Sequence, residues 1–544
     1  MKRWIRPVLV TAVLAIGFCP VGSAKEFDYD IAIRGGTLYL GGFSMAGIGD
    51  VAVKGDRIVA VGQAPGKARH EINARGMIVS SGFIDLHTHC DTPFQMTRGI
   101  PLPESFKANL NYITQGVTTV VTGNCGSGFT GPAEISAWLD RVDKMPFGTN
   151  VIHLFPHGDL RLRVMGKGQA SRPDPAPTPE ELRKMKEILN EGLRAGAWGM
   201  STGLEYDPGA RADLEELMEL NQVVASHAGI YCSHLRHEGP DPDQMIAAIE
   251  EAIAIGERAG TPVQISHIKC SGKQVHGMSQ RVIEVIEAAR ARGVQVFADQ
   301  YPYPAGSTTL SYLVPVDKRD GAKVLAQYCT PQGRASIYDE VANTLKNEIP
   351  PEGALISLYP WKWWLQGKTI AEIAKKRGED PVEVAMDLAC GRIGTGIYFT
   401  MSENDLTHFM SQDWVATGSD GATFSKLLAY AHPRFYGTFP RKLRRYVYGQ
   451  QVISLPFALR SMTELPAQIF EIPDRGQLEP GYFADIVVFN PDTIRDLATF
   501  EKPCQFSQGI EYLLVNGILT IERGKYTGQR GGRSLRHQVT SEKF

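Results

Sequence analysis

Two histidines, His87 and His89, stand one residue apart at the end of the largely apolar stretch GFIDLHTH (82–89). Successive side chains of a β-strand point to opposite faces, so these two imidazoles would lie on the same face. At about 7 Å apart along a strand, two imidazoles can converge on one metal ion. Because a histidine pair also occurs as an ordinary hydrogen-bonded pair in a core, the motif by itself indicates a metal site without requiring one.

Three further potential ligands also follow strand-like segments. Cys125 comes after the apolar run 117–122, while His234 and His267 close the segments 230–234 and 263–267. Taken singly, each is more simply a buried thiol or a polar residue at the start of a loop. Together, however, thiolate and imidazole are ligands that zinc commonly takes in proteins. The sequence therefore predicts a metal site at the ends of several strands, with five candidate ligands: His87, His89, Cys125, His234 and His267.

A carboxylate completes the set of candidate reactive groups. Asp420 lies in the stretch ATGSDG (416–421), directly after another strand-like segment. The sequence Ser-Asp-Gly is also common in ordinary turns. Beside a metal, a carboxylate can take a proton from the attacking water and pass it to a leaving nitrogen. Asp420 is therefore the predicted catalytic residue.

The middle of the chain alternates strand-like and helix-like segments, which is the pattern of repeated βα units. Eight strand candidates lie at 82–86, 117–122, 150–155, 197–201, 230–233, 263–266, 294–298 and 415–418. This number predicts an α/β fold with a (β/α)8 TIM-like barrel, in which catalytic residues come from the C-terminal ends of the strands. The alternation of strand-like and helix-like segments stops at about 309–376, where Trp361, Trp363 and Trp364 cluster. We expect an insertion over the barrel mouth there.

Both ends of the chain carry short strand-like pieces that glycine and aspartate interrupt. Neither end offers enough strands for a good sandwich by itself. We therefore predict a small β-sandwich domain formed jointly by residues 25–80 and 455–544, with residues 81–454 as the barrel.

The first 24 residues have the order of a cleavable signal peptide. The cationic start MKRWIR precedes an apolar run at 8–18 and the small residues Gly22 and Ala24. The run is too short to span a bilayer, which needs about 20 apolar residues. We therefore predict cleavage after Ala24 and a periplasmic or secreted protein without a membrane partner.

The bulk composition narrows the classes of partner. The 544 residues are 43% hydrophobic and 21% charged with a formal net charge of −2, which is typical of a globular protein and offers no basic field for nucleic acid. The eight cysteines are widely spaced without a CxxC pair, and removal of Cys19 with the leader leaves an odd number. This spacing argues against a disulfide framework in a chain of this size.

Longer motifs surround the candidate residues. Besides GFIDLHTH they are GNCG (123–126), LRLRVMG (160–166), STGLEYDPG (201–209), SHLRHEG (233–239), SHIK (266–269), ADQYPYPAGST (298–308), GSDG (418–421) and HPRFYGTFPR (432–441). As a set, these motifs are highly specific and resemble the amidohydrolase superfamily, in particular its D-aminoacylase branch, the N-acyl-D-amino-acid deacylases. The resemblance covers nearly the whole chain after the leader and implies the same fold, a barrel with a small β-sandwich.

The resemblance also implies roles for the matching residues. The ligands of a tightly held Zn2+ are matched by Cys125, His234 and His267. Those of a second, more weakly held metal are matched by His87 and His89. Asp420 matches the catalytic acid and base. The positions that bind the substrate, chiefly its α-carboxylate, are matched by Tyr206, Lys269, Tyr301 and Arg434.

The implied reaction is zinc-dependent hydrolysis of an N-acyl-D-amino acid to a carboxylic acid and a D-amino acid. Four departures from the family pattern stand out. No glycine precedes His157, which concerns the third βα loop. The stretch 422–431 is longer than expected and the Trp361–Trp364 cluster is unusual, and both would reshape the side-chain pocket. No arginine after Leu310 clearly matches the one that D-glutamate-specific members use. The last departure favours a neutral or bulky apolar side chain on the substrate.

Three alternatives remain at this point. The first is a cyclic amidase such as a D-hydantoinase or dihydroorotase, which typically bridges two metals with a carboxylated lysine, although 197–203 contains no lysine. The second is hydrolysis of another amide or ester, such as a D-aminoacyl dipeptide, a lactone or a xenobiotic amide. The third is a non-catalytic binding protein, which would have no use for the proton shuttle that Asp420 offers.

Overall fold

The centre of the molecule is a closed ring of eight parallel strands. The computed structural model describes residues 27–96, 102–169, 176–315, 322–391, 394–424 and 430–538, so the predicted signal peptide lies outside the described residues. The ring contains β6 (Phe83–Asp85), β7 (Val117–Thr122), β8 (Asn150–His153) continued by β9 (Phe155–Pro156), β10 (Gly199–Gly203), β11 (Ile230–His234), β12 (Val263–Ile265), β13 (Val296–Gln300) and β17 (Val415–Thr417). A parallel bridge between Thr88 and Gly421 closes it. The predicted (β/α)8 barrel is confirmed.

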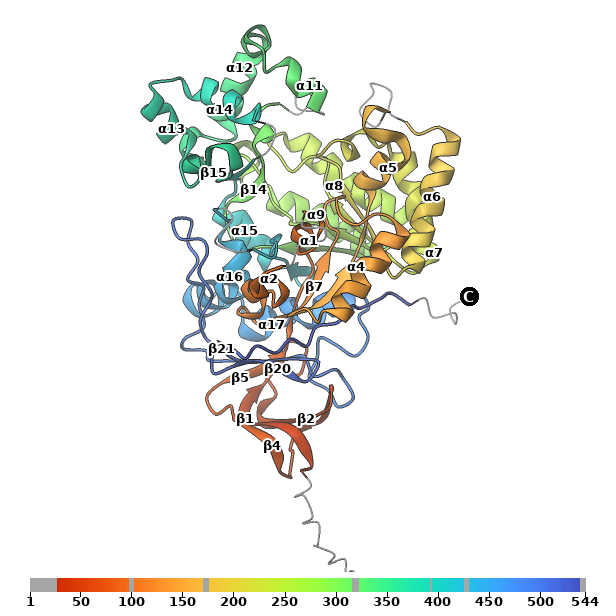
Figure 1. Cartoon of the computed structure of the whole chain (residues 1–544), viewed down its shortest axis with the longest axis vertical. Helices are drawn as coiled ribbons and strands as arrows, with labels where there is room; N and C mark the ends of the chain where they lie inside the picture. The colour runs from red at the N-terminus through yellow and green to blue at the C-terminus, as the bar shows by residue number, and fades with distance from the viewer. Residues whose placement is uncertain are drawn as a thin grey trace, which may run out of the picture.

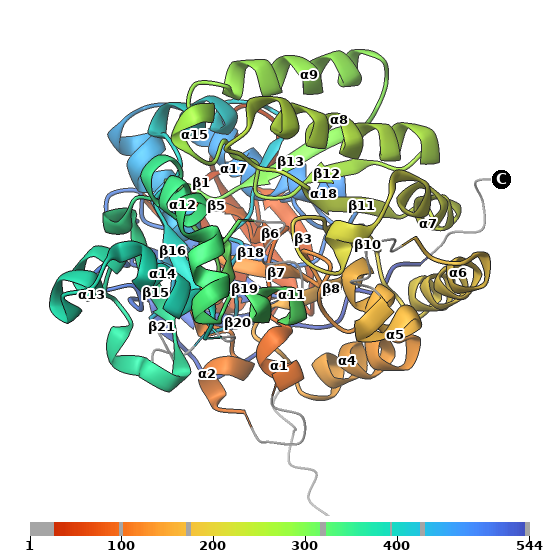
Figure 2. The ribbon, with the colours of Figure 1, turned by 90° about the horizontal axis from the view of Figure 1, so that it is seen from above.

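Amphipathic helices surround the ring (Figures 1 and 2). The longer ones are α4 (Pro132–Lys144), α6 (Pro179–Arg194), α7 (Leu214–Ser226), α8 (Pro242–Ala259) and α9 (Ser279–Ala291). The start of α6 shows how the sequence sets a boundary. The Thr178 hydroxyl accepts a hydrogen bond from the Glu181 backbone N–H, the Glu181 carboxylate accepts one from the Thr178 N–H, and Pro179 occupies the first helical position.

A second domain is one sheet made from the two ends of the chain. The N-terminal part supplies β1 (Tyr29–Leu38), β2 (Gly47–Lys54), β3 (Arg57–Gly62), β4 (Ala68–Asn73) and β5 (Ile78–Ser81). The C-terminal part supplies β18 (Ile486–Phe489), β19 (Ile510–Val515), β20 (Ile518–Glu522) and β21 (Lys525–Tyr526). The two parts join where β5 and β18 pair antiparallel, with Ser81 opposite Ile486. Some of its apolar side chains form a separate core, whereas others, among them Val487, Phe489 and Leu513, pack into the main core that the barrel shares.

The C-terminal share of this sheet domain begins later than the predicted residue 455. Helices α17 (Leu455–Met462) and α18 (Glu464–Ile469) pack against β6 and β17 and so belong to the barrel. The reason is the apolar content of these helices: Leu459 and Met462 are buried in the main core, and Leu465 is buried in a cluster with barrel-strand residues such as Ile84 and Val121.

The insertion between β13 and β17 is a small unit with its own core (Figure 1). It contains β14 (Gly306–Thr309), β15 (Ala354–Leu358), β16 (Thr395–Tyr398), α11 (Ala322–Gln327), α12 (Pro331–Asn347), α13 (Ile370–Arg377) and α14 (Pro381–Ala389). It extends past the predicted residue 376 because β16 pairs with both β14 and β15. The predicted tryptophan cluster lies within it, and Trp361 and Trp363 are about 70% exposed.

One disulfide, Cys329–Cys390, joins two helix ends of the insertion. The sequence argued against a disulfide framework, and a single bridge inside a small separate core is the observed exception. Its two cysteines are 61 residues apart in the chain, so spacing alone did not pair them.

The last described residues run along the N-terminal side of the barrel strands. Gly532 forms a bridge with Phe147, and Ser534 forms one with Val151 of β8. The Trp198 indole N–H donates to the Leu535 carbonyl at 2.7 Å. Within the described ranges, no helix combines the length and the apolar character that crossing a membrane requires.

Candidate metal centre

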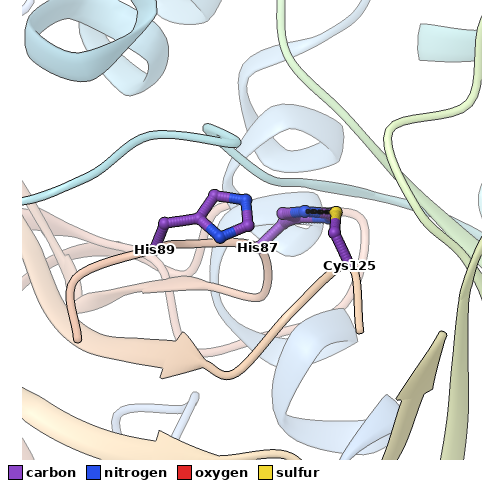
Figure 3. A group of neighbouring side chains, drawn as sticks. All are labelled: His87, His89 and Cys125. Atoms are coloured by element: carbon purple, nitrogen blue, oxygen red, sulfur yellow. Dashed lines mark hydrogen bonds between the residues drawn. The ribbon is translucent and has the colours of Figure 1, made fainter. Parts of the chain in front are cut away.

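The five predicted metal ligands gather at the C-terminal mouth of the barrel. Figure 3 shows His87, His89 and Cys125 side by side. Cys125 Sγ lies 3.3 Å from His87 Nε2. His267 Nε2 lies 3.7 Å from the same sulfur. Two groups each have donor atoms within 4.8 Å of one another, and Cys125 belongs to both: His87 with His89, and His234 with His267.

Parallel strands bring these residues together because their C-terminal ends meet at one rim. His234 is the last residue of β11, while His87 and His267 each follow a barrel strand by two residues. Cys125, His267 and Asp420 have φ values of 54°, 37° and 48°. This left-handed region is uncommon for residues other than glycine, and such strain concentrates at functional sites.

A buried carboxylate holds the ring of each of three predicted ligands. Asp299 Oδ2 lies 3.3 Å from His87 Nδ1, Glu238 Oε1 lies 2.9 Å from His267 Nδ1, and Glu205 Oε2 lies 3.1 Å from His234 Nε2. Such contacts fix the orientation and tautomer of metal-binding histidines. The motifs at 298–308, 201–209 and 233–239 contain Asp299, Glu205 and Glu238, but residue type alone does not assign these acids a role. The signal that the sequence offers for them is an acidic residue inside a highly specific motif.

The electrostatic surroundings favour a thiolate at Cys125. Burial alone raises the pKa of a thiol, but the neighbouring imidazoles, above all His87, hold the pKa of Cys125 well below its ordinary value. The thiolate is the form that binds a metal.

The donor set fits a zinc ion. It combines one thiolate with imidazole nitrogens, which are the ligands of many zinc sites. His234 Nδ1 is buried and has no hydrogen-bond partner within the described part of the chain, while its Nε2 is held by Glu205. One nitrogen of this histidine therefore remains available as a ligand.

Asp420 lies between the histidine pair and Arg434. Its Oδ1 is 3.2 Å from His89 Nε2 and 3.6 Å from His87 Nε2. Its Oδ2 is 2.8 Å from Arg434 Nη2. Burial raises the pKa of a carboxyl group, but Arg434 and His89 outweigh it and hold the pKa of Asp420 well below its ordinary value. The carboxylate is therefore ionised and placed to accept a proton.

Two of the four predicted substrate-binding residues present buried polar atoms without partners among the described residues. These atoms are the Tyr301 hydroxyl and the Arg434 Nε and Nη1. The guanidinium carbon of Arg434 lies 4.5 Å from the centre of the Tyr301 ring. Leaving such donors buried and unpaired costs free energy, which an anionic ligand would recover.

The other two predicted substrate-binding residues are already engaged. Lys269 Nζ donates to Glu238 Oε1 at 2.6 Å, and Glu238 outweighs the effect of burial, so the pKa of Lys269 is raised. The Tyr206 hydroxyl lies 3.0 Å from Thr308 Oγ1 on β14 of the insertion, and its ring packs 4.6 Å from that of His234. Both side chains thus border the metal centre.

The amidohydrolase family model matches residues 70–521. This chain belongs to the amidohydrolase family. A D-aminoacylase of Alcaligenes xylosoxydans xylosoxydans is 35% identical to this amidohydrolase over 532 residues, which cover 93% of this chain and 97% of the relative. An N-acyl-D-aspartate deacylase of the same organism is 34% identical over 536 residues, with 94% of each chain covered.

A solved structure agrees with these sequence relatives. The N-acyl-D-glutamate deacylase of Bordetella bronchiseptica, crystallised with zinc and a phosphonate inhibitor, matches this amidohydrolase with a TM-score of 0.77 and 33% identity. The match covers 93% of this chain and 99% of that one. The resemblance inferred from the motifs is therefore confirmed at the level of family and fold.

Proposed function

We propose that this amidohydrolase hydrolyses the amide bond of N-acyl-D-amino acids with bound zinc. The observation that carries the proposal is the position of Asp420, in contact with the predicted ligand His89 on one side and with Arg434 on the other. Hydrolysis of such a substrate needs a proton shuttle at the metal and an anchor for a carboxylate, and these groups are adjacent here. Relatives at 34–35% identity carry the names of D-aminoacylase and N-acyl-D-amino-acid deacylases.

Cys125, His234 and His267 would hold the tightly bound zinc, and His87 and His89 would hold a weaker second metal. The chemistry that zinc supplies when bound is Lewis-acid activation of water and of the amide carbonyl. A D-aminoacylase has been described as having a binuclear centre in which one metal activates and the second attenuates. The shared position of Cys125 in both ligand groups supports a paired metal centre here.

The residues of this chain bind the substrate, orient it and transfer protons. Arg434 and Tyr301 bind the α-carboxylate through their unpaired donors, and Lys269 adds positive charge nearby. With the carboxylate fixed there and the amide at the metal centre, the two enantiomers of a substrate would direct their side chains to different sides of the site, so these two anchors together would distinguish D from L. Asp420 accepts a proton from the attacking water and delivers it to the amide nitrogen as the bond breaks.

A panel assay tests the proposal. Zinc-loaded protein is offered N-acetyl-D-methionine, N-acetyl-D-glutamate, N-acetyl-L-methionine and a 5-substituted hydantoin, with and without a chelator. We expect chelator-sensitive release of D-methionine, with little turnover of the acidic substrate. Hydrolysis of the hydantoin in place of the linear amides would refute the proposal. The barrel's fourth strand, β10 (Gly199–Gly203), has no lysine to be carboxylated, which disfavours that outcome.

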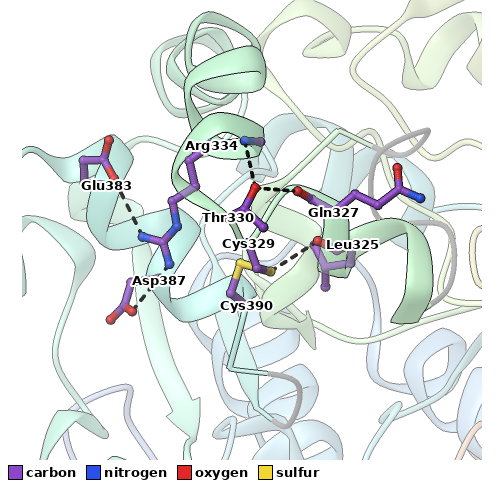
Figure 4. The surroundings of a disulfide bond; sticks show 9 residues. Leu325, Gln327, Cys329, Thr330, Arg334, Glu383, Asp387 and Cys390 are labelled. Carbon is purple, nitrogen blue, oxygen red and sulfur yellow. Dashed lines mark hydrogen bonds and ion pairs between the residues drawn. A yellow bond between two sulfur atoms is a disulfide. The ribbon is translucent and has the colours of Figure 1, made fainter.

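We further propose that the protein is exported to the periplasm or secreted. The order of residues 1–24 supports export, and so does the Cys329–Cys390 disulfide (Figure 4), because disulfides persist in oxidising compartments. Expression of the full chain in a host with a periplasm, followed by N-terminal sequencing, tests this. Mature protein in the periplasmic fraction that begins at Lys25 is expected, and unprocessed protein in the cytoplasm would contradict it.

A further inference from the structure

Glu238, a buried residue between β11 and α8, contacts both a predicted zinc ligand and a predicted substrate-binding residue. We propose that Glu238 is a positioning residue that sets the tautomer of His267 and at the same time anchors Lys269. The proposal rests on the proposed function above, since it assigns these two partners their roles. It adds a link between metal binding and substrate binding through one carboxylate.

The contacts of Glu238 define this position. Its Oε1 lies 2.9 Å from His267 Nδ1 and 2.6 Å from Lys269 Nζ. Its Oε2 lies 3.8 Å from His234 Nε2. The side chain is 8% exposed, so water competes little for these contacts. The carboxylate therefore meets two elements of the centre, the end of β11 and the loop after β12.

The surroundings of His267 explain why a carboxylate is needed. The Lys269 ammonium lies 2.8 Å from His267 Nδ1 and can only donate a hydrogen bond. If Nδ1 accepted that bond, the ring proton would sit on Nε2, the nitrogen that faces Cys125 Sγ at 3.7 Å. A protonated nitrogen cannot bind a metal. Glu238 accepts from both groups, so Nδ1 keeps the proton and Nε2 keeps its lone pair.

Glu238 also balances charge beside the metal. Glu205, His234 and Glu238 have the spacing of a small cation site. The Lys269 ammonium already contributes the positive charge there, since it lies 2.6 Å from Glu238. Neutralising Glu238 would leave a buried ammonium next to a dication. Loss of this one carboxylate should therefore weaken zinc binding and also leave Lys269 without its anchor.

The test compares four proteins: wild type, Glu238→Gln, Glu238→Asp, and Glu238→Gln combined with Lys269→Met. The readouts are zinc affinity of the metal-free protein by competition with a chromophoric chelator, the thiolate-to-cobalt absorption of the Co2+-substituted protein, and kcat and KM. We expect Glu238→Gln to weaken zinc binding by about 10–100-fold and to raise KM. Glu238→Asp should recover part of both losses.

The double variant is the decisive arm. Once Lys269 is gone, no ammonium competes for His267 Nδ1, so zinc affinity should recover toward the wild-type value while KM stays high. Glu216→Gln is the matched control, because Glu216 is also buried and also contacts one histidine and one cation, His157 at 2.8 Å and Arg161. It should leave zinc affinity and the cobalt spectrum unchanged.

Two results would overturn the proposal. One is wild-type zinc affinity in Glu238→Gln, and the other is a weakened affinity that the second substitution does not restore. Zinc affinity and the cobalt spectrum do not depend on turnover. If wild type fails to hydrolyse any N-acyl-D-amino acid, the proposed function fails while these two readouts still decide the role of Glu238.

Discussion

Asp420 Oδ2 and Arg434 Nη2 form an ion pair of 2.8 Å at the barrel mouth, with both side chains almost fully buried. The pair joins the predicted proton shuttle to the predicted carboxylate anchor. Among the described residues, two donor nitrogens of Arg434 have no partner, and Asp420 Oδ1 lies beside the histidine pair. Each residue can thus contact the substrate with one of its polar atoms while another of its atoms maintains the ion pair.

Replacing Asp420 should remove catalysis and spare the metal. Asp420→Ala is expected to lower kcat by about 10²–10⁴-fold, which is the usual contribution of a general acid and base. Zinc content measured by atomic emission should persist, because Cys125, His234 and His267 are untouched. Near-normal turnover in this variant would exclude Asp420 as the shuttle.

Replacing Arg434 should mainly weaken substrate binding. Arg434→Lys keeps the positive charge but loses the planar fork that can bind Asp420 and a carboxylate together. We expect KM to rise by about 10-fold or more, equivalent to roughly 1.4 kcal/mol or more of binding free energy. Steady-state kinetics on the best substrate of the panel will measure it. A change in kcat with KM constant would instead place Arg434 in the chemical step.

Lys442, at the start of the helical segment Lys442–Gly449, should make stability depend on pH. It is buried, donates to Thr417 Oγ1 and Ser461 Oγ, and burial lowers its pKa from 10.5 to about 7. Between these two values the unfolded chain binds more protons than the native one, so stability rises with pH. The slope is at most about 1.4 kcal/mol per pH unit.

Lys442→Met tests this expectation, because Thr417 Oγ1 and Ser461 Oγ remain 3.2 Å apart and can pair with each other. The variant should be more stable than wild type at pH 6, where the buried charge is fully present, and its advantage should shrink toward pH 10. Urea unfolding at several pH values measures the difference. An advantage that is constant with pH would mean that packing, not charge, is responsible.

Loss of the disulfide should loosen the insertion. The bridge closes a loop of 61 residues, which corresponds to about 4 kcal/mol on chain-entropy grounds. Cys329→Ser with Cys390→Ser should therefore unfold the insertion at lower denaturant, as reported by limited proteolysis between the two positions at rising urea concentration. A reductant should shift wild type in the same direction and leave the double variant unchanged. An equal reductant effect on both proteins would show that the bridge is irrelevant.

The C-terminal segment should stabilise the barrel. Truncation after Gly528 removes the bridges to Phe147 and Val151 and leaves the Trp198 N–H buried without its acceptor. An unpaired buried donor alone costs about 1–3 kcal/mol, so a clear fall in Tm is expected. Truncation after Gln538 retains every one of these contacts and serves as control. Equal melting temperatures for the two truncations would contradict the prediction.

The sequence predicted those parts of the site that depend on residue type at strand ends. His87, His234 and Asp420 could be placed because barrel strands deliver their C-terminal residues to one rim, whichever helices lie between them. Glu205 and Glu238 could not be placed, because they lie in loops whose path depends on tertiary packing. The Cys329–Cys390 pairing could not be predicted for the same reason, because tertiary packing in the core of the insertion brings the two cysteines together.

The pairing of β5 with β18 has a consequence for the order of events during synthesis. Ser81 and its partner Ile486 are separated by about 400 residues, which a ribosome adds in about 20–80 s at 5–20 residues per second. Throughout that interval β5 offers an open hydrogen-bonding edge to any other nascent chain. Among the described strands, only β18, which is made after all the barrel strands, pairs with that edge, so folding of the N-terminal strands before that point leaves an exposed strand edge of the kind that promotes aggregation.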